Sequence, residues 1–279
     1  MQIDVHIHLS SPEIKGDRPS LLIREPALKL LYSSVEAKMA STEDVLATLK
    51  ENGIDKALVG GFPFQDEDCA RRYNDWLISE CQKHPDILYP LVTFDPRASF
   101  AIEMARYYLD NGAYGLGELC VYDEGLTPRV LENLSAMCLM CLHKNAPILV
   151  HVNEPIGHDY PGKAPIELKE IYSLVKASHG AKLILAHFGG GLPFYASLKK
   201  ELKETLKTVR FDTAAMPFLF DPISLKLAAQ LLGPQYFLFG SDYPLLDAKR
   251  YRKYLAASGL TASDCDLIMG ENARAFLGL

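Results

Sequence analysis

The sequence predicts a (β/α)₈ barrel, in which eight parallel strands alternate with helices around a closed core. Short apolar runs alternate with amphipathic stretches along the whole chain, a pattern that is typical of a parallel sheet. After a long first unit the runs recur about every 25–35 residues, and eight such units fit a barrel of this size. No glycine-rich dinucleotide fingerprint follows the first run, which disfavours an open, doubly wound sheet.

The strands are expected where Val, Ile, Leu, Phe and Tyr gather in short runs, because such runs suit strands buried on both faces. These runs are residues 3–8, 56–62, 88–94, 113–119, 147–152, 182–188, 209–214 and 236–241. Helical periodicity lies between them, near 42–52, 66–83, 99–110, 128–143, 165–179, 194–207, 222–232 and 247–257. Residues 270–277 are expected to form a short closing helix.

The connection after the first strand, residues 10–41, is unusually long. It contains Pro12, Gly16, Pro19 and Pro26, which are followed by an apolar stretch. Connections of this length are usually functional or disordered, and this one leaves the carboxyl end of a strand. The segment is therefore either a partial lid over an active site or a passive surface insertion. No linker interrupts the chain, so we expect one barrel domain over residues 1–279.

Composition excludes several classes of protein. The net charge is −6 with acids and bases interspersed, so a surface that binds nucleic acid through bulk positive charge is disfavoured. No apolar run reaches membrane-spanning length, and no secretory signal pattern is visible. Six cysteines lack disulfide-like spacing, which favours a reduced, cytoplasmic protein. A homo-oligomer is compatible with the sequence.

Two histidines, His6 and His8, alternate with aliphatic residues in the first strand. Successive side chains of a strand point to opposite faces, so these two share one face about 7 Å apart along the strand. A buried imidazole without a partner is costly, whereas two on one face can bind one metal ion. A pair of hydrogen-bonded core histidines is the alternative.

Four further polar residues follow aliphatic runs at the ends of other expected strands. They are Glu118, His151, His187 and Asp242. Each alone could cap a helix or end a strand. In a barrel, however, the carboxyl ends of all strands meet at the face that carries active sites. The six residues together therefore predict a metal centre at one mouth.

The ligand types indicate what such a centre could do. Imidazole and carboxylate bind zinc, and also manganese, iron or nickel, so we expect one or two divalent ions, with zinc first. Without cysteine ligands a closed structural zinc site is not expected, and positions remain open for water. A bound ion lowers the pKa of its water to about 7, and Asp242 could carry the proton to a leaving group. Hydrolysis of a small amide, lactone or ester is thus the first expectation.

The loop that follows His151 is dense in polar, aromatic and turn-forming residues. Asn153, His158, Tyr160 and Lys163 are its candidates for contacts with the anionic or carbonyl groups of a substrate. A solvated loop is the alternative.

Taken together, these motifs resemble the amidohydrolase superfamily, in its amidohydrolase-2 and TatD-like branches. The resemblance spans most of the chain and is carried by His6-Ile7-His8, Gly115-Leu116-Gly117-Glu118, His151, Ala186-His187-Phe188-Gly189-Gly190, Phe239-Gly240-Ser241-Asp242-Tyr243-Pro244 and Gly270-Glu271-Asn272-Ala273. It implies that His6, His8 and Asp242 hold one ion, with Asp242 also moving the proton. It further implies that Glu118 bridges to a second ion held by His151 and His187.

Two other activities remain open within this resemblance. Relatives similar to aminocarboxymuconate-semialdehyde decarboxylase use one metal and leave a histidine of the sixth strand free for proton transfer, which would make His187 a catalytic acid. A TatD-like nuclease is disfavoured by the acidic composition. A barrel that binds metal without catalysis is the remaining alternative.

Overall fold

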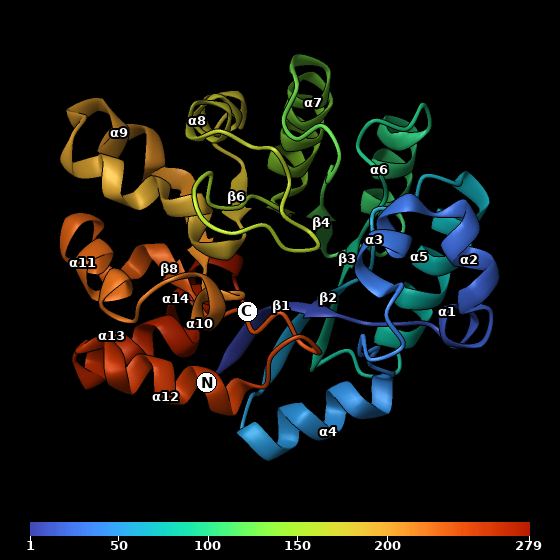
Figure 1. The fold of residues 1–279 in the computed structure, drawn as a ribbon, viewed down its shortest axis with the longest axis horizontal. Coiled ribbons are helices and arrows are strands. Elements are labelled where there is room, and N and C mark those ends of the chain that lie inside the picture. Colours follow the sequence, from blue (N-terminus) through green and yellow to red (C-terminus); the bar gives the residue numbers. More distant parts are fainter.

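The computed structural model describes residues 1–279 and shows an eight-stranded parallel sheet with the strands in sequence order (Figure 1). The strands are β1 (Ile3–His8), β2 (Lys56–Gly60), β3 (Leu88–Val92), β4 (Gly115–Leu119), β5 (Pro147–Val150), β6 (Lys182–Leu185), β7 (Val209–Asp212) and β8 (Phe237–Leu238). Helices surround the strands, as Figure 1 shows. The prediction of a (β/α)₈ barrel is therefore confirmed.

The barrel closes between β1 and the segment that follows the very short β8. The Val5 amide donates to the Phe239 carbonyl at 2.9 Å, and the Asp242 amide donates to the His6 carbonyl at 2.9 Å. The His8 amide donates to the Tyr243 carbonyl at 2.8 Å. This closure places Asp242 directly beside the paired histidines of β1.

The helices that follow the strands are α4 (Thr42–Asn52), α5 (Glu67–Cys81), α6 (Ala101–Asp110), α7 (Pro128–Lys144), α8 (Leu168–Ala177), α9 (Lys200–Thr205), α10 (Met216–Leu219), α11 (Ile223–Leu232), α12 (Ala248–Ser258), α13 (Ala262–Asp266) and α14 (Asn272–Leu277). The longer of these helices are amphipathic, and α4, α5, α7 and α12 begin with a side-chain cap. Helix α4 begins with a capping box between Ser41 and Asp44 and ends at Gly53, whose φ of +63° suits glycine.

The long first connection folds into three short helices, α1 (Pro12–Gly16), α2 (Arg18–Arg24) and α3 (Pro26–Tyr32). Figure 1 shows them in blue beside α5. The Glu25 carboxylate, which is buried, accepts hydrogen bonds from the amides of Gln65 (2.8 Å) and Asp66 (3.1 Å) at the start of α5. The segment is thus attached to the barrel by hydrogen bonds at a helix N-terminus, where a carboxylate is favourable.

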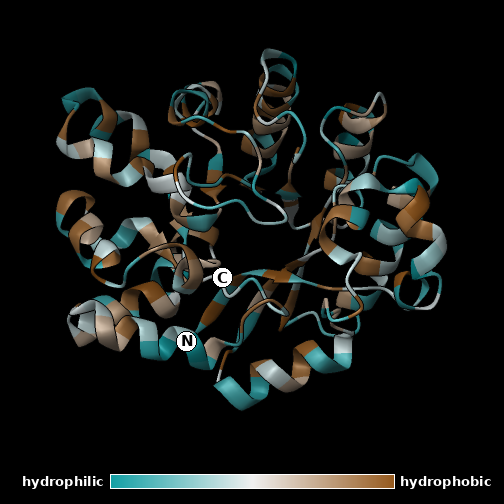
Figure 2. Cartoon of the chain, in the orientation of Figure 1, coloured by the Kyte–Doolittle hydropathy of each residue, from teal (hydrophilic) through white to brown (hydrophobic).

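Two apolar layers hold the barrel together. The larger packs the helices against the outside of the sheet, and Figure 2 shows largely apolar strands surrounded by helices in which apolar and polar residues alternate. The smaller fills the inside of the barrel at its N-terminal end, where Ile3, Leu58 and Ile184 pack with Leu277 of α14. Gly270 leads into that helix, and a Cβ there would lie 2.0 Å from the Met1 carbonyl oxygen, so only glycine fits.

Two expected elements differ from the structure. The helix expected at 194–207 is replaced by the turn segment η1 (His187–Ser197), then α9 and η2 (Leu206–Thr208). Residues 188–191 all have positive φ, which the glycines at 189–191 permit. The strand expected at 236–241 is shorter because its last residues leave the sheet to approach β1.

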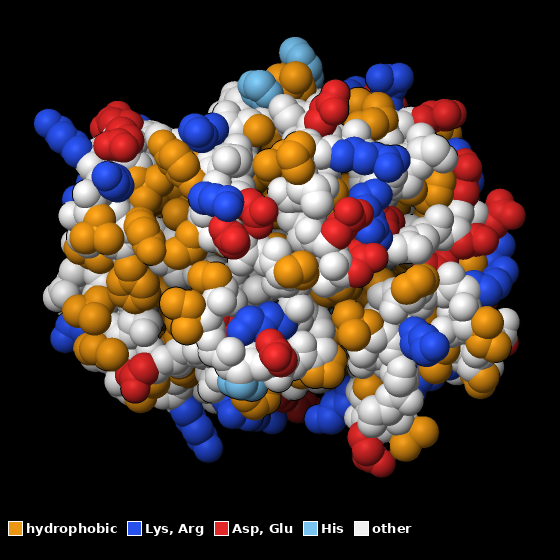
Figure 3. All heavy atoms as spheres, turned by 45° about the horizontal axis from the view of Figure 1, so that its top comes forward, with side chains coloured by type: hydrophobic (Ala, Val, Ile, Leu, Met, Phe, Trp, Pro, Cys, Tyr) orange, Lys and Arg blue, Asp and Glu red, His pale blue; other side chains and the backbone are white.

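None of the helices combines the length and apolarity that crossing a bilayer requires. On the face shown in Figure 3, acidic and basic side chains are interspersed rather than gathered into one basic patch.

Candidate metal centre

The two histidines of β1 present the same ring atom to the same point. Their Nε2 atoms lie 3.2 Å apart. The Nδ1 atom of His6 lies 2.7 Å from a carboxylate oxygen of Asp212, and that of His8 lies 3.1 Å from the Gly61 carbonyl oxygen. A nitrogen that donates its hydrogen to an oxygen leaves the other nitrogen with a lone pair. Both histidines are therefore arranged as Nε2 ligands.

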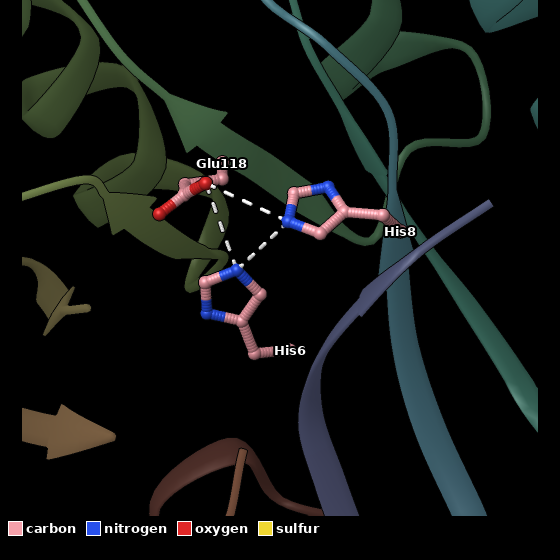
Figure 4. A group of neighbouring side chains, drawn as sticks. All are labelled: His6, His8 and Glu118. Atoms are coloured by element: carbon pink, nitrogen blue, oxygen red, sulfur yellow. Dashed lines mark hydrogen bonds and ion pairs between the residues drawn. The ribbon is translucent and has the colours of Figure 1, made fainter. Parts of the chain in front are cut away.

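Glu118, at the end of β4, has one carboxylate oxygen on each side of the centre. Its Oε2 lies 3.6 Å from Nε2 of His6 and 3.7 Å from Nε2 of His8, the group drawn in Figure 4. Its Oε1 lies 3.1 Å from Nδ1 of His151 and 3.3 Å from Nε2 of His187. Two sets of three ligand-type residues, each close enough to hold an ion, thus share this carboxylate.

Asp242 completes the first set, because its Oδ1 lies 3.0 Å from Nε2 of His8 and 3.7 Å from that of His6. Asp242 has a φ of +59° and His187 a φ of +51°. Such a backbone conformation disfavours any residue with a Cβ, at a cost of roughly 1–3 kcal/mol each. The rest of the fold therefore holds both side chains in unfavourable backbone conformations at the centre.

Asp212, at the end of β7, connects three strands at the centre and was not among the predicted site residues. One oxygen meets His6, and the other accepts hydrogen bonds from the amides of His187 (2.8 Å) and Ala214 (3.0 Å). A carboxylate behind a metal-binding imidazole fixes its tautomer and orientation. The signal was present, since Asp212 ends a strand as the other four do, but the apolar run was expected to continue to 214.

The histidines of the centre lower the pKa values of its two carboxylates. Burial raises the pKa of Glu118, but His6 and His151 outweigh it and hold that pKa well below its usual range. Burial also raises the pKa of Asp242, yet its hydrogen bond to His8 and the charge of His6 bring the pKa to about 2. Both carboxylates are therefore ionised at neutral pH.

The imidazoles shift in the opposite direction. Burial lowers the pKa of His187, but the hydrogen bond and charge of Glu118 outweigh it and raise this pKa to about 9. In His6, too, burial is outweighed, here by the charges of Glu118 and Asp212, and its pKa lies well above its usual value. Protons on buried imidazoles thus provide the positive charge that a divalent ion would otherwise bring.

The ring of His151 gives independent evidence that these residues fit a cation. Its Nε2 is buried and has no hydrogen-bond partner, which is costly for a polar atom. Its Nδ1 lies 3.1 Å from Nε2 of His187, whose own Nδ1 lies 3.2 Å from the Ala214 carbonyl oxygen. Imidazole nitrogens that have no hydrogen-bond donor nearby, next to two ionised carboxylates, form a ligand set that suits a divalent ion.

A third group with ligand-type atoms, Glu25, Asp66 and Cys69, lies under the first connection. Its carboxylates accept hydrogen bonds from backbone amides at the start of α5, including Cys69 N to Asp66 at 2.8 Å. These bonds explain the group as helix capping.

A cavity of about 570 Å³ opens above the metal centre. His8, Glu118, His151, His187 and Asp242 reach it from the strand ends. Its remaining wall is mostly apolar and aromatic and is formed by Leu31, Tyr32, Phe62, Tyr122, Tyr160, Phe218, Leu219 and Leu245, among others.

The loop after β5 lines this cavity only in part. His158 and Tyr160 belong to the wall, as does Gly162. Asn153 and Lys163, which were also expected to contact substrate, do not line it. The Asn153 side chain is buried and binds the backbone of Ala164 (2.8 and 3.0 Å), which fixes the loop. The Lys163 ammonium pairs with Glu154 at 3.3 Å.

The first connection contributes more to the cavity than the sequence indicated. Leu31, Tyr32, Ala37 and Lys38 line it. The Tyr32 ring packs edge-on against Phe62 with centroids 4.7 Å apart. Residues 10–41 therefore form part of the wall around the centre.

Comparison with known proteins places the chain in a family. A "6-methylsalicylic acid decarboxylase" from Penicillium expansum is 28% identical over an alignment of 131 residues, and the match covers 36% of this chain and 39% of that protein. This chain thus matches well under half the length of that relative.

Solved structures show the same fold at low sequence identity. 5-Carboxyvanillate decarboxylase from Sphingomonas paucimobilis superposes with a TM-score of 0.74 at 15% identity, covering 100% of this chain and 99% of that one. Dihydroxybenzoic acid decarboxylase from Polaromonas sp. JS666, solved with bound manganese and the inhibitor 2-nitroresorcinol, gives 0.68 at 15% identity, covering 100% and 97%. The amidohydrolase family itself matches residues 3–279, so the chain belongs to the amidohydrolase family.

Proposed function

We propose that this protein is a metal-dependent, non-oxidative decarboxylase of a small aromatic acid that carries a hydroxyl next to its carboxylate. The decarboxylases that resemble it act, by their names, on 6-methylsalicylic, 5-carboxyvanillic and 2,6-dihydroxybenzoic acids. All three substrates have a hydroxyl ortho to a carboxylate. This proposal replaces hydrolysis of an amide, lactone or ester as the first interpretation.

The observation that carries the proposal is the position of His187 in the wall of the cavity. His187 lines the cavity and is buried, and its Nε2 lies 3.3 Å from a carboxylate oxygen of Glu118, which favours the protonated ring. In the hydrolase interpretation His187 would be a ligand of a second ion, whereas in a decarboxylase it would be the acid that protonates carbon. His187 is therefore suited to protonate carbon.

We assign the ion to His6, His8, Asp242 and the facing oxygen of Glu118, with His151 beside them. A divalent ion bound there would supply positive charge that holds the substrate carboxylate and the adjacent hydroxyl. Manganese is the first ion to test, because the Polaromonas enzyme was solved with it, and zinc suits the same donors. Asp212 keeps the His6 ring in its ligand orientation throughout.

The residues of the chain then account for the reaction, in which an aromatic carboxylate and a proton yield the arene and carbon dioxide. The apolar wall, with Phe62 and Phe218, packs against the ring and excludes water. His187 transfers its proton to the ring carbon that bears the carboxylate. The carbon–carbon bond then breaks and its electron pair restores the aromatic ring. His187 regains a proton from solvent.

The segment 10–41 is proposed to act as the lid of this cavity. It contributes Tyr32 and Lys38 to the wall, and its anchor on α5 through Glu25 keeps those side chains in place. The Tyr32 hydroxyl forms no hydrogen bond within the protein and is free to bind a polar group of a substrate.

The test is turnover of 2-hydroxybenzoates by the manganese-loaded protein, followed by chromatography and by release of carbon dioxide. In D₂O the product should carry deuterium at the carbon that lost the carboxylate. Two variants separate the roles. His6→Asn should lose bound metal, whereas His187→Asn should keep metal and lose turnover. Retention of full turnover in His187→Asn would refute its assignment as the acid.

Hydrolysis with two ions stays the second candidate, because the two oxygens of Glu118 face two separate sets of ligands. Elemental analysis distinguishes the candidates. About two metal equivalents per chain, together with ester or lactone cleavage, would favour the hydrolase. One equivalent with carbon dioxide release would favour the decarboxylase.

A further inference from the structure

Two positively charged side chains lie on the inward face of the sheet at the N-terminal end of the barrel. Arg210 of β7 is in register with Ile184 of β6, and Lys182 precedes Ile184 by two residues. Ile184 belongs to the apolar cluster inside the barrel, so side-chain alternation places Lys182 and Arg210 on the same inward face. Aliphatic side chains usually fill this level of such a barrel.

A cavity of about 340 Å³ opens beside these two residues, between the starts of β6 and β7 and helix α14. Lys207 is the third cation that lines it, and Phe276 of α14 forms an aromatic wall. No aspartate or glutamate lines this cavity. It lies at the opposite end of the barrel from the metal centre, since it forms at the starts of the strands.

The two inward cations have no counter-charge. Neither Lys182 nor Arg210 forms an ion pair, whereas Lys207 pairs with Glu204 at the rim. The guanidinium of Arg210 lies over the Phe276 ring, 4.6 Å from its centroid. Its Nη1 donates to the carbonyl oxygens of Lys207 (3.1 Å) and Val209 (2.8 Å), and its Nε is buried and has no hydrogen-bond partner, so Nη2 is the nitrogen left for a ligand. Buried charge of this kind is costly unless a partner compensates it.

Burial lowers the pKa of the Lys182 ammonium and that of the Arg210 guanidinium. The cavity also holds two neutral donors that make no hydrogen bond within the protein, the Thr208 hydroxyl and the Gln235 amide. The cavity thus combines an unpaired guanidinium and an unpaired ammonium with a hydroxyl and an amide, while the ammonium of Lys207 at the rim is paired with Glu204.

We infer that this cavity is a binding site for a small, doubly charged oxyanion of the phosphate type. The Arg210 guanidinium can donate through Nη2 to an anionic oxygen, and the Lys182 ammonium adds a point charge, which together suit a tetrahedral oxyanion. Two inward cations favour a dianion over a single carboxylate. The net charge of the protein is −6, so this concentration of cations is not a property of the whole surface.

The test is calorimetric titration of the metal-loaded protein with inorganic phosphate, against sodium chloride and acetate at equal ionic strength. Saturable binding of phosphate is expected, with acetate much weaker. Lys182→Met keeps the apolar stem of the side chain but removes its charge. It should weaken phosphate binding by about tenfold or more, because a charge-assisted hydrogen bond is lost. Lys203→Ala, on the exposed face of α9, is the charge-matched control and should bind as the wild type does.

Arg210→Lys provides a second variant that keeps the charge and removes the Nη2 donor together with the stacking of the guanidinium on Phe276, and it should also bind phosphate more weakly. Asp242→Asn distinguishes the two ends of the barrel and should leave phosphate binding unchanged. Three results would overturn the inference. They are no saturable binding to the wild type, wild-type affinity in both Lys182→Met and Arg210→Lys, or binding that is lost only in Asp242→Asn.

Discussion

The two ends of the barrel handle buried charge in opposite ways. At the mouth, imidazoles and carboxylates lie within hydrogen-bond distance of one another. They come from β1, β4, β7 and the segments that follow β5, β6 and β8. At the other end, Lys182 and Arg210 face inward without any acid. The mouth has an excess of ligands for a cation, and the opposite end has an excess of donors for an anion. One fold can therefore hold ions of opposite sign at its two ends.

The largest expected effect is on catalysis at the mouth. His187→Asn removes the proposed acid while an amide still fits the site, and the rate should fall by about 10²- to 10⁴-fold. Lys182→Met at the other end should leave the rate unchanged. Turnover of a 2-hydroxybenzoate by both variants at equal metal content measures this. Equal loss in both would mean that the two ends are not independent.

The second effect concerns pH and appears only after metal has been removed with a chelator. The pKa of His187 is raised to about 9, so its imidazolium stabilises the folded state fully below pH 6.5. That stabilisation, on the order of 3 kcal/mol, is lost as the pH rises through about 9. Urea unfolding at several pH values should show a larger fall in the wild type than in His187→Asn, in which only His6, whose pKa is also raised, still contributes.

Manganese should reverse the pH trend, because ligand histidines must lose their protons to bind it. Its affinity should rise with pH, and calorimetry in buffers of different ionisation enthalpy should detect released protons. A metal affinity that does not change between pH 6 and pH 9 would contradict this description of the mouth.

The third effect tests the role of Asp212. Asp212→Asn keeps the size of the side chain but weakens its hold on the His6 ring, and metal affinity should fall by about 10- to 100-fold. The control variant is Asp221→Asn, which changes an exposed carboxylate on the segment before α11. Dissociation constants from competition with a metal-binding dye decide between them, and equal affinities would remove Asp212 from the centre.

The smallest effect is on stability at the N-terminal end. Because Lys182 is partly desolvated without a counter-charge, Lys182→Met should change the free energy of unfolding by less than about 1 kcal/mol in phosphate-free buffer. In phosphate the wild type should become more stable than the variant. A large loss of stability in phosphate-free buffer would show that Lys182 has a structural partner.

The sequence was sufficient to predict the fold and the meeting of His6, His8, Glu118, His151, His187 and Asp242 at one mouth. The reason is that these residues end aliphatic runs, and parallel strands bring such ends together. The branch of the superfamily was harder to predict, because TatD-like and decarboxylase-like features share the same ligands. Whether His187 acts as an acid depends on how close its ring lies to Glu118. That distance cannot be read from the spacing of residues along the chain.

Other features depended on contacts between distant segments. Asp212 was hidden within an apolar run that ends two residues earlier than expected. Asn153 and Lys163 were polar residues of a promising loop, but local hydrogen bonds use both. Lys182 and Arg210 begin strands, where charged residues are usually solvated, and their inward direction follows only from register with Ile184.

Helices α1–α3 are formed from one uninterrupted stretch of chain between β1 and α4, yet none of the ligand side chains belongs to them. Glu25 attaches them to the start of α5, the ion pair between Glu13 and Arg72 adds a second contact, and apolar side chains such as Leu21 and Leu28 pack into the core. Residues 10–41 can therefore be exchanged as one segment without altering the ligand residues. Grafting the corresponding stretch from another barrel of this family, with an acid retained at the anchor, would reshape the entrance and redirect substrate choice while the ion-holding strands stay as they are.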